Sequence, residues 1–356
     1  MRSALAERLL SVLMDWDNSP KFTQEIPRVQ TLAALKYDEY GGYGAGVKFV
    51  ENFSRWLRQF KAGEERETAY NFVMKSLVFI SEAEMGHLIE IAWPDFLKGR
   101  LVARAASDTR ISPHLIKTVT SSPNFKRLTR STLFFGLSDG ARLDQLRRSS
   151  PLSHEQFVQN YEIKSELADS LQSALARALG QADSDSKFQQ IFLVDDFSGS
   201  GHTLIRDDEG IVKGKLEKFQ RQFHDLIKRG ILDEDCQVGL LLYVATEQAK
   251  DYLTASSLID VPKLTIDIEQ LIGNAFRVDL TDTAMTELCM TYYDERATDI
   301  HKKRVPIGYS DCALPLVITH NTPNNSVCLL WSEIEDADNS PRALFPRYER
   351  HHRDRP

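Results

Sequence analysis

Apolar residues recur at helical spacing through the first 100 residues of the chain. Between positions 49 and 60 aromatic and leucine side chains return every three or four residues, and the stretch 70–78 repeats this pattern. The period predicts amphipathic helices that each bury one broad stripe. Ser81 with Glu84 three residues later is the pattern of a capping box, which predicts a helix start, and Pro94 predicts the end of that helix or a new start. We therefore expect a helical N-terminal region over residues 1–100.

The pattern changes after residue 100. Short apolar runs now alternate with helical stretches at 162–180 and 215–229. The runs occupy positions 133–136, 191–194, 238–245 and 314–318. Such alternation is typical of the α/β class, in which a parallel sheet is flanked by helices, and we expect one such domain over residues 101–335. The remainder, 336–356, is a tail rich in Arg and Pro that we expect to be a loosely packed arm.

Composition places the chain among ordinary globular proteins. Its 356 residues are 42% apolar and 27% charged, and the net charge of −7 argues against general binding to polyanions. No apolar run approaches the ~18 residues needed to cross a bilayer, and the N-terminus lacks the pattern of a secretory signal. The four cysteines show no C-x-x-C spacing, which argues against a zinc ribbon and a small disulfide scaffold. We expect a soluble, cytoplasmic protein without a membrane partner.

The strongest chemical signal follows the apolar run at 191–194. Two adjacent carboxylates, Asp195 and Asp196, come directly after it, and a loop of small residues comes next. The loop contains Ser198, Gly199, Ser200, Gly201, His202 and Thr203. At the carboxyl end of a parallel strand these residues would lie in the crevice where α/β sheets bind ligands. Glycines let backbone N–H groups approach a phosphate, hydroxyls add donors, and carboxylates bind ribose hydroxyls or hold Mg²⁺ through water. The alternative is that the two carboxylates only end a strand and cap the next helix.

Two segments after this loop carry no such signal. Residues 207–210 have the composition of a hairpin turn. The stretch 210–216 resembles a P-loop, but it has three residues between its glycines where a P-loop has four, and Leu216 replaces Ser or Thr. We therefore exclude a P-loop.

The sequence VDDFSGSGHT resembles the signature of type I phosphoribosyltransferases for phosphoribosyl pyrophosphate (PRPP), in register over ten positions. The resemblance implies that Asp195 and Asp196 contact the ribose hydroxyls and that residues 199–203 hold the 5′-phosphate. Two positions depart from the family pattern. Purine-salvage members usually carry an Asp where this chain has Gly199, and His202 stands where a smaller residue is common. The first departure argues against hypoxanthine or guanine as the acceptor.

A second segment, 132–148, combines a strand, a glycine-containing loop and a helix start. In the enzymes that it resembles, a loop after the first strand holds the pyrophosphate. This implies the same role for Ser138, Asp139, Gly140, Ala141 and Arg142. Residues 98–148 contain eleven Lys and Arg residues against three Asp and Glu, inside a net-acidic protein. A basic lining suits a substrate with several phosphate charges, and a solvated basic face is the alternative.

A third segment, 308–331, ends a predicted strand at His320 and continues through Asn321 into the sequence TPNN. Together with the phosphate loop and the helical stretch 84–102, it resembles PRTase-CE, the phosphoribosyltransferase-like family of bacterial conflict and anti-phage loci. The resemblance covers about residues 45–332 and implies a substrate-binding role for His320 and Asn321, although such a segment is also ordinary turn chemistry. It further implies a winged-helix partner protein and, in a retron operon, a reverse transcriptase with its msDNA.

Three hypotheses about function follow. The first is an enzyme, a phosphoribosyltransferase-like protein that binds PRPP or a ribose-5-phosphate nucleotide with Mg²⁺ at Asp195 and Asp196 and acts at C1 of the ribose. The resemblance gives this enzyme the role of an effector in bacterial anti-phage defence. The second hypothesis is a sensor that binds the same ligand without turnover. The third is an interaction protein that docks a winged-helix or nucleic-acid partner.

Overall fold

The chain divides into two compact units, which are described separately. The computed structural model describes residues 3–17, 19–159, 163–261, 264–295, 304–333 and 342–347. The first unit combines Met1–Glu84 with Gly273–Pro356, and the second is Met85–Ile272. These units group the chain differently from the expected boundaries at 100 and 335, because residues 273–335 share a compact unit with the N-terminal helices.

The first unit is mainly helical. Its elements are α1 (Ser3–Leu13), α2 (Pro20–Leu35), η1 (Tyr37–Glu39), α3 (Phe49–Leu57), α4 (Gly63–Lys75), β1 (Val78–Ile80), η6 (Asn274–Phe276), α13 (Thr283–Thr291), η7 (Tyr309–Asp311), β9 (Leu316–Ile318) and α14 (Cys328–Trp331). The expected apolar stripe of 49–60 is fully buried, and the indole N–H of Trp56 donates to the carbonyl of Leu329 at 2.8 Å. One core thus joins the two ends of the chain.

A short parallel sheet changes two predictions in this unit. Helix α4 ends at Lys75, and the last residue of the stretch 70–78, Val78, begins strand β1 and pairs with Leu316 of β9. The apolar run 314–318 therefore belongs to this two-stranded sheet and not to the larger sheet expected over 101–335. The sequence pattern could not show this pairing, because it joins residues that are remote along the chain. The backbone N–H of Val78 donates at 2.7 Å to the carbonyl of Pro315, which is more than 200 residues away in the sequence.

The expectation of a loosely packed tail is wrong for residues 342–347. Ala343, Leu344 and Phe345 are buried, and the ring of Phe345 packs against Phe49 at a centroid distance of 5.8 Å. The hydroxyl of Tyr40 donates to the carbonyl of Pro346 at 2.7 Å. The prediction relied on the overall content of Arg and Pro in the tail and overlooked these three apolar residues. Leu344 and Phe345 belong to the core of the unit. The rest of the tail, 336–341 and 348–356, lies outside the described residues.

The unit boundary falls inside α5 (Glu82–Ile91), whose predicted capping box is confirmed. The hydroxyl of Ser81 accepts from the backbone N–H of Glu84 at 3.1 Å, and the Glu84 carboxylate accepts from the backbone N–H of Ser81 at 2.9 Å. Pro94, however, does not end the helical segment. It lies in a π-helical turn, η2 (Ala92–Leu97), which runs directly into α6 (Lys98–Thr109). A widened turn tolerates a residue that has no N–H to donate.

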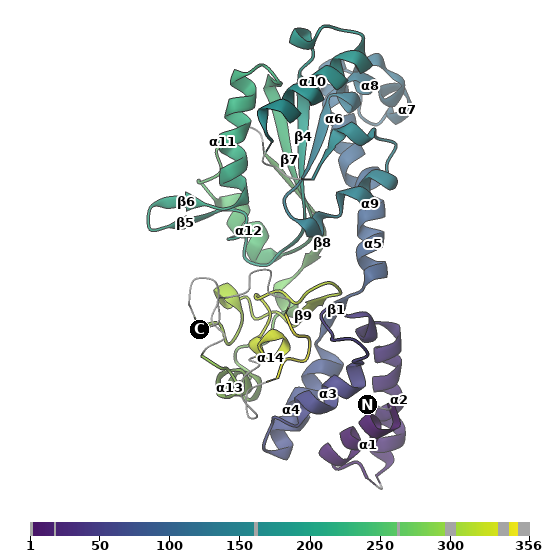
Figure 1. Ribbon diagram of the computed structural model, residues 1–356, viewed down its shortest axis with the longest axis vertical. Helices are drawn as coiled ribbons and strands as arrows, with labels where there is room; N and C mark the ends of the chain where they lie inside the picture. The colour runs from purple at the N-terminus through teal and green to yellow at the C-terminus, as the bar shows by residue number, and fades with distance from the viewer. Residues whose placement is uncertain are drawn as a thin grey trace. The chain divides into compact units, whose positions relative to one another are not determined.

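The second unit is an α/β domain, as expected, with a five-stranded parallel sheet flanked by helices (Figure 1). The strands are β2 (Thr132–Gly136), β3 (Phe157–Val158), β4 (Phe188–Ser198), β7 (Leu232–Thr246) and β8 (Thr265–Ile272). Their order in the sheet is β3-β2-β4-β7-β8, and every neighbouring pair is parallel. Counted along the chain this is the order 2-1-3-4-5, in which the direction of strand addition reverses between β2 and β4. Parallel sheets of this order bind ligands at the carboxyl ends of the strands beside that reversal.

Helices and short segments complete this unit. They are α7 (Ile116–Ser121), α8 (Pro123–Arg130), η3 (Asp139–Ala141), α9 (Leu143–Arg148), η4 (His154–Gln156), α10 (Ser165–Leu179), η5 (Asp183–Asp185), β5 (Arg206–Asp208), β6 (Ile211–Lys213), α11 (Lys215–Lys228) and α12 (Glu247–Ala255). Apolar residues of α10, α11 and α12 share one core with alternate residues of the central strands, so these helices cover one face of the sheet. In the described part of the chain, no helix is both long enough and apolar enough to cross a membrane.

Candidate functional site

Two loops follow the neighbouring strands between which the strand order of the sheet reverses. Residues 137–142 follow β2 and residues 199–203 follow β4, and the two strands are hydrogen-bonded neighbours over their whole shared length. The backbone N–H of Leu137 donates to the carbonyl of Val194 at 2.9 Å, so the first loop leaves the sheet beside the carboxylates of β4. Asp195 and Asp196 lie within β4 and not after it, because pairing with β7 continues through Ser198.

Asp195 is almost completely buried and is held on both carboxylate oxygens. The ammonium of Lys215 lies 2.6 Å from Oδ2, and the hydroxyl of Ser138 donates to Oδ1 at 2.5 Å. Burial raises the pKa of Asp195 and the neighbouring Asp196 adds to this, while Lys215 and Ser138 act in the opposite direction. Through these two contacts Asp195 holds the first loop and the start of α11 against the central strand β4.

Lys215 is the functional residue that the sequence analysis missed. It opens helix α11, and it follows the loop 199–203 only after an intervening hairpin. Its backbone N–H donates to the carbonyl of Thr203 at 3.2 Å, which returns the chain to the end of the loop. The signal was the lysine in the stretch 210–216, which we excluded as a P-loop and then left without a role.

Asp196 is half-buried and lies against the backbone of Gly140. The hydroxyl of Ser138 is 3.3 Å from Oδ1 of Asp196, so one serine contacts both carboxylates. A Cβ atom on Gly140 would lie 2.2 Å from Oδ2 of Asp196, which is closer than any real contact. The glycine is needed here for space, because a side chain would occupy the position of the carboxylate.

The loop 138–142 is anchored from the sheet beneath it. The buried hydroxyl of Tyr243, on β7, donates to the carbonyl of Ala141 at 3.1 Å. Asp139, Gly140 and Ala141 form the single turn η3, and Arg142 follows in the left-handed conformation with φ of +47°. The loop thus turns sharply above β7 before α9 begins at Leu143.

The loop 199–203 is equally well anchored. The hydroxyl of Thr246 donates to the carbonyl of Gly199 at 2.5 Å. Gly201 has φ of +79°, and a Cβ atom there would lie 2.6 Å from the ring of Tyr252, so both its backbone and its surroundings require glycine. The ring of His202 packs edge-on against Tyr252 at a centroid distance of 4.6 Å, which gives this larger residue a packing role. Of the loop side chains, Thr203 is exposed, while Ser198 and Ser200 are buried.

Comparison with known proteins shows the family of the chain. The family model PRTase-CE matches residues 53–347. The chain belongs to the PRTase-CE family. The protein is therefore phosphoribosyltransferase-like. No curated protein and no solved structure matches the chain.

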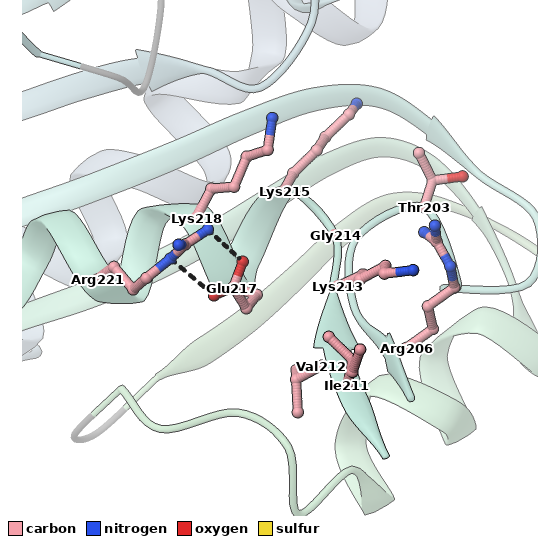
Figure 2. Close-up of a pocket in the computed structure, with 10 residues that line it drawn as sticks. All are labelled: Thr203, Arg206, Ile211, Val212, Lys213, Gly214, Lys215, Glu217, Lys218 and Arg221. Carbon is pink, nitrogen blue, oxygen red and sulfur yellow. Dashed lines mark hydrogen bonds and ion pairs between the residues drawn. The ribbon is translucent and has the colours of Figure 1, made fainter. Parts of the chain in front are cut away.

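The PRTase-CE chain has an open cleft of about 500 Å³ next to the loop 199–203 (Figure 2). We call it the hairpin cleft, because the hairpin β5–β6 and the first two turns of α11 form it. The cleft is lined by Thr203, Arg206, Ile211, Val212, Lys213, Gly214, Lys215, Glu217, Lys218 and Arg221. The hairpin turn predicted at 207–210 is confirmed, with positive φ at Glu209 and Gly210. Lys215 therefore lines this cleft and also contacts the buried Asp195.

A further carboxyl group is buried in the same unit. Glu269 on β8 lies next to Tyr243 in the register of β7 and β8, which pairs Leu242 with Ile268. Burial, with a smaller contribution from Asp95, raises the pKa of Glu269 from its ordinary value near 4.5 to about 9. Both of its carboxyl oxygens are buried without a hydrogen-bond partner, which fits a neutral, protonated group.

His320 and Asn321 belong to the first unit of the PRTase-CE chain, whereas the carboxylates and the two loops belong to the second. Strand β9 ends at Ile318, two residues before His320. The backbone N–H of Asn321 donates to the carbonyl of Ile318 at 2.9 Å, and Gly41 donates to that of Thr319 at 2.8 Å. The segment is thus a hydrogen-bonded turn, as its composition allowed, and a substrate-binding role for it stays a prediction.

The described residues contain no group of three or more His, Cys, Asp and Glu side chains that could hold a metal by themselves. All four cysteines are buried and free. A cation at this site would accordingly need most of its ligands from substrate and water, which is the usual way in which Mg²⁺ binds beside phosphates.

Proposed function

We propose that this protein binds PRPP or a ribose-5-phosphate nucleotide with Mg²⁺ where the strand order reverses, and acts at C1 of the ribose. The observation that carries the proposal is the contact of Ser138 with both Asp195 and Asp196, which joins the first predicted loop to the carboxylate pair. Two phosphate-sized loops with a carboxylate pair between them suit a ligand that carries a ribose flanked by a phosphate and a pyrophosphate.

Each part of the site has a role in this proposal. The exposed hydroxyl of Thr203 and the backbone N–H groups of 199–203 bind the 5′-phosphate. Asp196, which is half-buried, accepts hydrogen bonds from the ribose hydroxyls. Asp195 is paired with Lys215, and in this proposal it positions the loop and neighbouring groups. Loop 138–142 holds the pyrophosphate, with Arg142 as its cation.

Mg²⁺ fits this donor set through Asp196 and not through a cage of protein ligands. The buried Asp195 has one oxygen against Lys215 and the other against Ser138, so its contribution to a cation is indirect. When bound, Mg²⁺ would neutralise the negative charge on the phosphate oxygens.

The reaction at C1 requires positioning more than a protein nucleophile. The bond from C1 to the pyrophosphate oxygen breaks and its electron pair leaves with the pyrophosphate, while an acceptor atom forms the new bond to C1. Charge develops on the leaving pyrophosphate and on the ribose ring. Donors that are already oriented toward the leaving group stabilise that charge without reorganisation. The anchored loop 138–142 supplies such donors in this proposal.

The test is a calorimetric titration of PRPP with and without Mg²⁺. We expect wild type to bind only with Mg²⁺, and the double variant Asp195→Asn/Asp196→Asn to lose binding. The matched control Asp183→Asn/Asp185→Asn changes two exposed carboxylates of the same unit and should bind like wild type. Absence of binding in folded wild-type protein would overturn the proposal. Release of pyrophosphate on addition of candidate acceptors then separates an enzyme from a sensor, since a sensor binds without product.

The family resemblance also supports a cellular role as an effector in anti-phage defence, together with winged-helix or reverse transcriptase partners. This role predicts that cells carrying the chain with its neighbouring genes restrict phage plaques. We expect Asp195→Asn/Asp196→Asn to abolish the restriction at equal protein level. Unchanged restriction would separate the defence role from this site.

A further inference from the structure

The hairpin cleft contains far more positive than negative charge. Of the residues that the structure describes, five with cationic side chains line it, and Glu217 is the single acidic one. The cations are Arg206, Lys213, Lys215, Lys218 and Arg221. This concentration stands out in a chain whose net charge is −7. A cleft lined by one sign of charge concentrates ligands of the opposite sign.

The cations come from two elements that face the same space. Lys215, Lys218 and Arg221 follow one another at intervals of three residues along α11, a rise of about 9 Å in total. Arg206 and Lys213 are paired residues across the hairpin β5–β6. Figure 2 shows the amines of Lys215 and Lys218 extending to the same side of the helix, with Arg206 and Lys213 on the other side of Gly214. The arrangement is elongated, which suits a chain of phosphates better than a single anion.

The existing ion pairs in the cleft are ones that a ligand can replace. Arg221 pairs with Glu217 at 2.7 Å and Lys213 with Asp208 at 2.7 Å, and the side chains of both cations are exposed, that of Arg221 more than that of Lys213. Exposed pairs of this kind contribute little to stability. A phosphate group that carries two charges can compete for these cations.

Arg206 has no carboxylate partner among the described residues. Its one hydrogen bond runs from Nη1 to the carbonyl of His202 at 3.3 Å, and its Nε is buried without a partner. A guanidinium without a carboxylate partner keeps its charge for an anionic ligand in the cleft that it lines. This unpaired cation is a second observation, beside the charge count, that points to an anionic ligand.

The rest of the lining describes the ligand further. Among the described residues, no aromatic side chain lines the cleft to stack against bases, and the apolar lining is limited to Ile211 and Val212. The volume of about 500 Å³ lies within the range of about 300–1,000 Å³ that is usual for small-molecule sites. These features favour recognition of a polyphosphate chain over recognition of bases in a nucleic acid strand.

We propose that the hairpin cleft binds the polyphosphate chain of a second small ligand, distinct from the ribose phosphate at loop 199–203. The inference goes beyond the proposed function and does not depend on it, since the cleft residues Lys213 and Lys218 take no part in that site. The two sites meet at Thr203, which lines the cleft, and share Lys215, whose ammonium is 2.6 Å from Asp195. A ligand in the hairpin cleft would therefore compete with Asp195 for this cation and link the two sites.

The test is calorimetric titration of inorganic tripolyphosphate, without Mg²⁺, into the full chain. We expect Lys213→Gln/Lys218→Gln to weaken binding at least tenfold. Both side chains are exposed, so the fold should be retained, which a thermal unfolding curve checks. Lys228→Gln is the matched control, because it removes an exposed lysine of the same helix outside the cleft and should leave binding unchanged.

Two further measurements separate this proposal from the proposed PRPP site and from binding of a nucleic-acid backbone. Asp195→Asn/Asp196→Asn should bind tripolyphosphate at least as tightly as wild type, since it releases Lys215, even though it is expected to lose PRPP. Equal binding by wild type, Lys213→Gln/Lys218→Gln and Lys228→Gln would overturn the inference, as would no binding by wild type. An eight-nucleotide single strand that binds through Lys213 and Lys218 while tripolyphosphate does not would also overturn it, in favour of a nucleic-acid backbone.

Discussion

Substitution of Gly140 by alanine is the sharpest perturbation of the candidate site. The backbone at Gly140 is in an ordinary conformation for any residue, so the added methyl group causes no backbone strain of its own. Its effect comes from one neighbour, because the new Cβ would lie 2.2 Å from Oδ2 and 2.5 Å from Cγ of Asp196. The substitution therefore tests the contact between loop 138–142 and the carboxylate of β4 without removing any polar group.

The magnitude follows from these distances. Ordinary contact begins at 3.4 Å, so the oxygen must retreat by about 1.2 Å. Asp196 is half-buried and can rotate toward solvent, which places the stability cost in the lower part of the ~1–3 kcal/mol typical of overpacking. Displacement of the carboxylate would remove the hydrogen bonds that we propose it accepts from the ribose hydroxyls, worth ~1.5–3 kcal/mol for a charged group. This corresponds to PRPP binding that is about 10- to 100-fold weaker.

The assay is a double-mutant cycle of Gly140→Ala and Asp196→Ala. PRPP affinity is measured by calorimetry with Mg²⁺, and the free energy of unfolding is measured in urea for the same four proteins. If Gly140→Ala acts through the carboxylate, its effect on both quantities should disappear in the Asp196→Ala background, which removes the group that it clashes with. The unfolding arm tests the contact even if wild type does not bind PRPP.

Two results would refute this reasoning. Binding of PRPP by Gly140→Ala as tight as that of wild type would mean that the position of Asp196 does not matter for the ligand. Alternatively, Gly140→Ala could weaken binding and stability by the same amount in both backgrounds. In that case the added methyl group would act through the loop backbone and not through Asp196.

The remaining predictions concern charge and packing. Glu269→Gln should stabilise the protein at pH 8 and much less at pH 5, measured by urea unfolding. Burial in the folded protein raises the pKa of Glu269 to about 9, so the native state holds a proton that the unfolded chain releases. Wild-type stability therefore falls as pH rises from about 4.5 toward 9, by at most about 1.4 kcal/mol per pH unit. A stability difference between variant and wild type that is the same at pH 5 and pH 8 would contradict this. Lys215→Met should cost about 3 kcal/mol of unfolding free energy, because it leaves the buried Asp195 carboxylate without its cation, and the added change Asp195→Asn should restore most of it. Phe345→Ala should cost about 3–5 kcal/mol, since its ring is fully buried, while the exposed Leu35→Ala control should change stability by less than about 0.5 kcal/mol; equal effects would show that the C-terminal segment does not belong to the core.

The local elements of this chain could be predicted from sequence because their signals lie within a few residues of one another. The apolar stripe of α3, the capping box of Ser81 and Glu84, and the hairpin at 207–210 all depend on contacts between near neighbours. Alternation of strands and helices was enough to predict the parallel sheet. The strand order was not predictable in this way, because it depends on which strands pair across long separations.

The chemistry of the candidate site shows the same division. Asp195, Asp196 and the loop 199–203 were found from sequence because they are contiguous and follow a buried strand. Lys215 was missed, since the hairpin separates it from the loop by a dozen residues and only the return of the chain at Thr203 brings it to Asp195. The position of the C-terminal segment around Phe345 was missed for a similar reason.

The sequence by itself thus determined the class of the fold, the carboxylate pair with its phosphate-type loop, and the family to which the chain belongs. Only the tertiary structure decided that Asp195 is buried and paired with Lys215, that Gly140 makes room for Asp196, and that five cations form one cleft. The physical reason is that burial, ion pairing and close packing depend on distances between residues that are remote along the chain. A periodic pattern carries no information about those distances.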